Sequence, residues 1–155
     1  MRCWSTITSS SSPARAAAVG KASVHSAVRA CLFVGGGTAP ALLEGMIATA
    51  KQSSVDVINM SIGGLPALND GNNARAILYN RLIEQTNAQM FLSAGNSYPG
   101  MNSVGDPSVA TRSMSIGAYV SDETFYVNYN ATVAKADGIF PFSSRGPRED
   151  GGLKP

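Results

Sequence analysis

Short apolar runs alternate along this chain with segments whose apolar positions recur at helical spacing. The runs are VRACLFV (28–34), VDVINMSIGG (55–64), AQMFLSAG (88–95) and SMSIGAYV (113–120), and the middle two end in small residues. Short, nearly continuous apolar runs bounded by glycine are typical of buried strands. We therefore expect four strands, with an irregular, aromatic-containing segment after residue 120.

Two longer segments carry the helical pattern. APALLEGMIATAKQ (39–52) and NARAILYNRLIEQTN (73–87) repeat apolar residues at i, i+3 and i+4, which predicts amphipathic helices. Thr38 is a candidate cap for the first helix, with Pro40 in its first turn. Strands that alternate with such helices indicate a parallel sheet, whose strands are apolar on both faces because both faces are covered. The predicted fold class is α/β.

In a parallel sheet, functional residues collect at the carboxyl ends of the strands. Here those ends are Gly35–Gly37, Ser61–Gly64 and Ser93–Asn96. Small residues at two neighbouring ends leave a groove in which an extended peptide can pair with exposed backbone. Asn96 would lie on its floor, where an amide donor beside a reacting carbonyl serves as an oxyanion-hole element. A turn-capping role for Asn96 is the open alternative, since Gly-Asn is common in loops.

The glycine run Gly35–Gly37 raises the question of a nucleotide site. A G-x-G-x-x-G fingerprint would need a third glycine at position 40, where Pro40 stands, and no Gly-Lys-Ser/Thr follows. The pattern favours a plain tight turn. A nucleotide-binding α/β domain and a non-catalytic peptide-binding module on the same scaffold remain the two alternative functions.

Composition narrows the possible partners. The 155 residues carry a net charge of +2, and 44% are hydrophobic. So small a charge predicts no nucleic-acid partner, and no run reaches the 18 or so apolar residues of a membrane span. One histidine and two cysteines without a ligand motif predict no metal or other cofactor. The sequence gives no indication of localisation.

Residues 1–27 differ in kind from the rest. No acidic residue occurs before Glu44, and the start is rich in serine and alanine, with Arg2, Arg15 and Lys21. Such a composition fits an organelle transit peptide, a disordered start or a reading-frame artefact. We expect an unrelated or disordered segment over 1–27 and one domain over 28–155.

Three motifs stand in an informative order: VDVINMSIGG, FLSAGNS and FSSRGP. In order and approximate spacing they resemble the subtilisin-like serine peptidases, the subtilases. The run SAGNSYPGMNSVGDPSVATRSMSIGAYVS, with FSSRGPREDG, is most similar to the tripeptidyl peptidase II branch. The resemblance covers about residues 28–155. It implies an incomplete three-layer, parallel-sheet fold, hydrolysis of peptide bonds, and a peptide or protein as the substrate of the full-length enzyme.

The resemblance also implies roles for particular residues. Asn96 matches the oxyanion-hole asparagine, and Ser61, Ile62 and Gly63 match the segment that lines the substrate cleft. Ala94 and Gly95 match a wall of the pocket for the residue before the scissile bond, and Gly105 matches its floor. Phe142–Pro147 matches the turn before the nucleophile-bearing region, to which Ser143 and Ser144 belong.

The departures from the family pattern concern the catalytic triad. Subtilases order it Asp, His, Ser, and none of the three family contexts occurs within residues 1–155. His25, the single histidine, stands in SVHSAV, which is not a family context. We therefore expect a central fragment of a catalytic domain, inactive alone, whose missing layers leave apolar faces exposed. Tyr98 also departs, because glycine is usual at its position in this branch.

Overall fold

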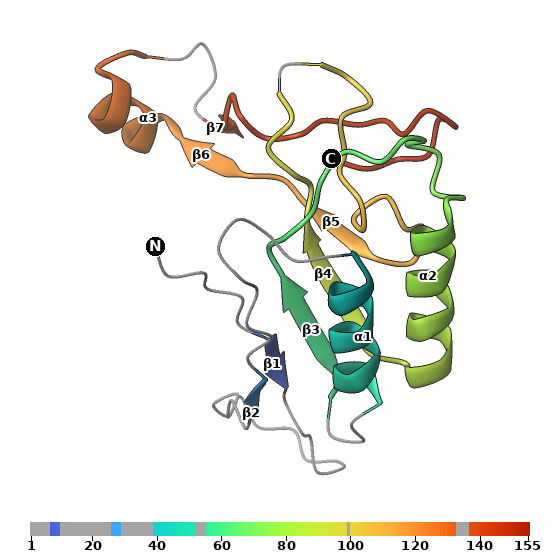
Figure 1. Cartoon of the computed structure of the whole chain (residues 1–155). Coiled ribbons are helices and arrows are strands. Elements are labelled where there is room, and N and C mark those ends of the chain that lie inside the picture. Colours follow the sequence, from blue (N-terminus) through green and yellow to red (C-terminus); the bar gives the residue numbers. More distant parts are fainter. Residues whose placement is uncertain (1–6, 10–25, 29–38, 52–54, 99, 133–136) are drawn as a thin grey trace, which may run out of the picture.

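The computed structural model describes residues 7–9, 26–28, 39–51, 55–98, 100–132 and 137–155 (Figure 1). Its centre is a three-stranded parallel sheet in the order β3-β4-β5, formed by Val57–Met60, Gln89–Ser93 and Met114–Ile116. Met60 is paired with Leu92, and Ser93 with Ile116. The predicted parallel arrangement of these three segments is confirmed.

Two helices cover one face of this sheet, α1 (Ala39–Ala50) and α2 (Ala74–Thr86) (Figure 1). Asn73 caps the start of α2, because its side chain accepts from the Ala76 N–H at 3.0 Å. Asn87 ends it in the left-handed region at φ 57°, with its N–H donating to the Ile83 carbonyl. Both predicted helices are confirmed, whereas the proposed cap Thr38 lies outside the described residues.

The core lies between these helices and the sheet. Alternate strand residues point into it: Ile58 and Met60 from β3, and Met90 and Leu92 from β4. The helices add Met46, Ala50, Ala76, Tyr79 and Leu82, and the loop between β4 and β5 adds Val104, Val109 and Ala110. This loop therefore packs in the same layer as the helices.

The opposite face of the sheet carries Asn59, Phe91, Met114 and Ile116, which alternate with the core residues. Met114 is 50% exposed and Ile116 48% exposed. Within the described part of the chain, the sheet thus has one helical layer, and its other face is partly open to solvent. The expected exposure of an apolar face is confirmed.

Three predictions about secondary structure either need correction or fall partly outside the described residues. The strand predicted over 113–120 is two strands, β5 and β6 (Tyr119–Ser121). The segment predicted to be irregular contains α3 (Asp122–Tyr129) and β7 (Asp137–Ile139), and β7 is antiparallel to β6. Of the strand predicted over 28–34, residues 29–34 lie outside the described ranges.

The N-terminal part contains a further strand pair. β1 (Ile7–Ser9) is antiparallel to β2 (Ser26–Val28), and β1 lies beside β3 (Figure 1). Among the helices in the described ranges, none combines the length and hydropathy needed to cross a bilayer.

Candidate functional site

Two adjoining clefts open at the carboxyl ends of β3 and β4. The larger encloses about 350 Å³, and its lining includes Ser61, Ile62, Gly63, Gly95, Asn96, Ser97 and Gly105. The smaller encloses about 240 Å³, and its lining includes Asn59, Ser61, Ala94, Asn96, Ile116 and Ala118. All seven residues singled out from the sequence therefore lie around the two clefts. Their functional roles stay a prediction at this point.

Backbone hydrogen bonds join the three segments that border the larger cleft. Gly64 and Asp106 exchange both N–H···O=C bonds, at 3.1 and 2.7 Å. The Gly105 N–H donates to the Ala94 carbonyl at 2.7 Å. The segment after β3, the end of β4 and the loop at Gly105 are thereby fixed relative to one another.

Glycine at two positions permits this close approach. A Cβ at Gly63 would lie 2.7 Å from the Asp106 carbonyl oxygen, which is closer than real Cβ contacts come. A Cβ at Gly105 would lie 3.2 Å from the Gly64 carbonyl oxygen. The small residues that suggested a groove therefore also allow its walls to meet at the base.

Asn96 lies at the rim shared by the two clefts. Its side chain is exposed and makes no hydrogen bond with the described residues. Gly95 before it adopts φ +111°, which L-residues with a side chain rarely do. The backbone thus turns sharply at the end of β4 and leaves the Asn96 amide available to donate.

The turn predicted over Phe142–Pro147 holds the loop that contains Asn96. The Ser144 N–H donates to the Gly95 carbonyl at 2.8 Å, and Ser144 Oγ accepts from the Ser97 N–H at 3.0 Å. Ser143 Oγ accepts from the Ala118 N–H at 3.1 Å. Both hydroxyls are buried, so these serines act as structural acceptors.

A second contact of the same turn reaches Tyr98 and Ser103. The Ser103 N–H donates to the Arg145 carbonyl at 2.9 Å, and the Arg145 N–H donates to Ser103 Oγ at 3.0 Å. The Arg145 guanidinium lies 5.4 Å from the centre of the Tyr98 ring. Sequence reasoning placed Arg145 in a turn and left Tyr98 unexplained, because their pairing arises only in the folded chain.

An ion pair between the buried Asp106 and the half-exposed Arg75 lies beside the base of the larger cleft. Asp106 is 2% exposed, and Arg75 Nε lies 2.6 Å from its Oδ2. Burial raises the pKa of the Asp106 carboxyl, an effect that Arg75 partly offsets. Burial, with the Asp106 charge as a second cause, raises the pKa of Tyr79 to about 12. Sequence reasoning missed this ion pair, since its members come from α2 and a distant loop.

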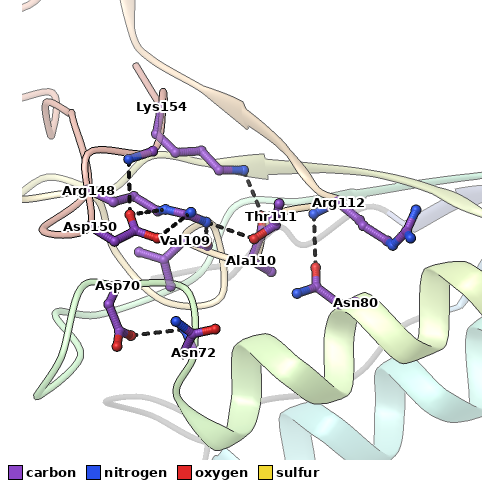
Figure 2. A network of polar contacts seen from close by, with 11 residues as sticks. Asp70, Asn72, Asn80, Val109, Ala110, Thr111, Arg112, Arg148, Asp150 and Lys154 are labelled. Carbon is purple, nitrogen blue, oxygen red and sulfur yellow. Dashed lines mark hydrogen bonds and ion pairs between the residues drawn. The ribbon is translucent and has the colours of Figure 1, made fainter.

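The segment 148–155 is attached to the loop between β4 and β5 (Figure 2). Arg148 donates to the Val109 carbonyl and to Thr111 Oγ1, both at 2.9 Å, and makes two bonds to the Asp150 carboxylate. Lys154 Nζ donates to the carbonyls of Ala110 and Ser113 at 2.7 Å. Burial, followed by the Arg148 charge, lowers the pKa of Lys154 to about 8.

Two sequence candidates cannot be placed. Gly35–Gly37 and His25 lie outside the described residues. Across the ranges that are described, no group of three or more His, Cys, Asp or Glu side chains is arranged to hold a metal ion.

The structure combines a parallel α/β sheet, a groove at the strand ends and an exposed asparagine amide at the rim of the groove. This is the arrangement that the three sequence motifs predict for a subtilisin-like chain. The model of the subtilase family matches residues 8–155, and the chain belongs to this family of serine-type peptidases. The predicted family is confirmed. Because the match begins at residue 8, the boundary at residue 28 stays a prediction.

Particular relatives are similar over short stretches of their length. Pyrolysin of Pyrococcus furiosus is 35% identical over a match that covers 83% of this chain and 10% of pyrolysin. Tripeptidyl-peptidase 2 of Caenorhabditis elegans is 37% identical, with 64% of this chain and 7% of the relative covered. Tripeptidyl-peptidase 2 of Oryza sativa is 34% identical, with 75% of this chain and 8% of the relative covered. The chain thus spans a tenth or less of these relatives.

Solved structures agree on the fold. The S41 psychrophilic protease superposes with a TM-score of 0.53 at 22% identity, over 74% of this chain and 34% of that one. Sphericase superposes with a TM-score of 0.51 at 17% identity, over 70% of this chain and 32% of sphericase. The predicted α/β, subtilisin-like and incomplete fold is therefore confirmed.

Proposed function

We propose that this chain supplies the substrate cleft and one oxyanion donor of a serine peptidase that hydrolyses peptide bonds. The observation that carries the proposal is the exposed Asn96 amide, which has no partner in the described part of the chain and lies at the rim of both clefts. Family membership and the names of the peptidase relatives support it.

The proposed mechanism follows from what each segment offers. An extended peptide pairs with the backbone of Ser61–Gly64, and a side chain of the peptide enters the larger cleft above Gly105. When a serine oxygen attacks the scissile carbonyl carbon, the carbonyl oxygen gains the negative charge and the histidine base takes the hydroxyl proton. Asn96 Nδ2 donates to that oxyanion.

Residues 1–155 contain neither the nucleophile nor the base in a family context. The role proposed for this chain is therefore binding and charge stabilisation. Loss of one oxyanion donor typically lowers kcat by about 10²–10³, so Asn96 is worth a substantial part of the rate in a complete enzyme.

A phosphinic peptide tests this role without a nucleophile, because its tetrahedral anionic phosphorus mimics the intermediate. We expect the chain to bind the phosphinic peptide roughly tenfold or more tightly than the matching amide peptide, as expected for a site complementary to the transition state. Asn96→Ala should abolish this difference and leave amide binding nearly unchanged. Asn128→Ala, on the exposed surface of α3, is the control.

The alternatives give different results in the same titration. A non-catalytic peptide-binding module would bind both peptides equally well. A turn-capping role for Asn96 would leave the phosphinic preference intact in Asn96→Ala. In Gly63→Val the new side chain would meet the Asp106 carbonyl. This variant should weaken the binding of both peptides if the larger cleft is their site.

A further inference from the structure

Among the described residues, Arg145 is a cation without a counter-ion. In the described part of the chain its guanidinium forms no ion pair and no hydrogen bond, and its Nε atom is buried without a partner. A buried charged donor left unpaired costs free energy, and most such groups in proteins have a partner. An unpaired guanidinium is therefore a candidate ligand-binding group.

Tyr98 holds this guanidinium in place. The Arg145 Cζ atom lies 5.4 Å from the centre of the Tyr98 ring, within the range of a cation–π contact. Stacking on a ring face uses none of the five N–H donors of the guanidinium. The donors on the two terminal nitrogens, as distinct from the buried Nε, stay available for a planar, bidentate acceptor such as a carboxylate.

The pair is connected to the larger cleft through neighbouring residues, although neither Tyr98 nor Arg145 lines it. Tyr98 follows Ser97, which lines that cleft, and Arg145 follows Ser144, which is hydrogen-bonded to Ser97 at 3.0 Å. Among the described residues that line the two clefts, none is charged. The buried carboxylate of Asp106, near the base, is already paired with Arg75.

We propose that Arg145, stacked on Tyr98, forms an anion-binding subsite that binds a carboxylate of the peptide held in the cleft. This inference rests on the proposed function, since it needs a peptide in the larger cleft. The carboxylate belongs either to an Asp or Glu side chain or to the peptide's own carboxyl terminus.

Removing the Arg145 side chain should not disturb the fold. Its three hydrogen bonds to Ser103 are made by the backbone N–H and carbonyl, which Arg145→Gln retains. Arg81→Gln removes the same charge from the exposed surface of α2 and serves as the matched control. Thermal unfolding of both variants checks that the chain remains folded.

The experiment titrates the full chain with fluorescent hexapeptides. One set has amidated ends and places Glu or Gln at each position in turn, and a second set has Gln throughout with a free or amidated end. We expect one carboxylate position to raise affinity roughly tenfold, as for a hydrogen bond to a charged group. This gain should weaken at high salt, vanish in Arg145→Gln, persist in Arg81→Gln, and fall in Tyr98→Leu.

The two sets distinguish the source of the carboxylate. A gain in the first set assigns it to an acidic side chain, and a gain confined to the second assigns it to the peptide end. Equal binding of all peptides, or a gain that survives Arg145→Gln, would overturn the subsite and leave the peptide cleft standing. A chain that binds no peptide would overturn the subsite and the proposed function together.

Discussion

The Ser144 N–H donates to the Gly95 carbonyl at 2.8 Å, and a methyl group at Gly95 would lie 2.8 Å from Ser144 Oγ. Ser144 thus contacts Gly95 both through its backbone N–H and through its hydroxyl, at the bend that precedes Asn96. Residue 95 must lack a side chain for two separate reasons, its φ of +111° and the proximity of the Ser144 hydroxyl.

Gly95→Ala should therefore lower the free energy of unfolding by about 2 kcal/mol or more. Gly64→Ala is the matched control, because a Cβ there meets no atom within 4 Å, and its effect should stay within about 0.5 kcal/mol. Urea denaturation measures both. Adding Ser144→Ala to Gly95→Ala should relieve the contact but not the backbone strain. The double variant should therefore lose less unfolding free energy than the two single variants together. Simple additivity of the two losses would contradict the contact.

The open face of the sheet should drive self-association. Replacing Met114 by Gln and Ile116 by Thr removes exposed apolar surface, and we expect less association in analytical ultracentrifugation with little change in unfolding free energy. Ile58→Thr, on the buried face of β3, should instead destabilise the chain by about 2–4 kcal/mol. Equal effects of the two changes would argue against a one-sided core.

Lys154 should make stability depend on pH in the alkaline range. Its pKa is lowered from 10.5 to about 8, chiefly by burial, so between these values the unfolded chain binds more protons than the folded chain. Stability from this group must then rise with pH from about 8 to 10.5. Tyr79, with its pKa raised to about 12, acts in the opposite direction above pH 10. Lys154→Met should remove the rise; an unchanged profile would exclude Lys154 as its source.

Residues 1–155 should show no peptidase turnover by themselves. Fluorogenic peptide substrates should remain uncleaved, and a serine-directed phosphonate should not label the chain. Ser143 and Ser144 are both buried, and among the described residues neither hydroxyl is hydrogen-bonded to a side-chain base. Mass spectrometry of the treated protein measures labelling. A covalent adduct that disappears in Ser143→Ala or Ser144→Ala would overturn this expectation.

Local pattern was sufficient for the elements that bury a regular face. Both helices and the strands β3 and β4 were predictable because their apolar residues repeat at the spacing of the element. The single strand expected over 113–120 was wrong because tertiary contacts break it at Ala118, whose N–H donates to Ser143 Oγ and whose carbonyl accepts from Phe140. Neither contact leaves a trace in the local sequence.

The short helix α3 carried a readable signal that its composition obscured. Ser121 accepts from the Thr124 N–H as an N-cap, and Asp122 and Glu123 occupy the first turn, as favoured at a helix start. None of the α3 residues is buried, so no apolar periodicity marks it. For the site, family motifs located the cleft residues, whereas Arg145 and Arg75 gain their meaning from neighbours distant in sequence.

Asn69 and Glu149, joined by two hydrogen bonds, stand 80 residues apart. The buried Asn69 amide also donates to the carbonyls of Asn102 and Val104, which lie in the loop that leads to Gly105. At 5–20 residues per second, a ribosome takes roughly 4–16 seconds to add the partner of Asn69 after Asn69 itself. Throughout that interval Asn69, which holds the loop beside the cleft, lacks its hydrogen bonds to Glu149. The groove is therefore expected to be among the last parts of the nascent chain to become rigid.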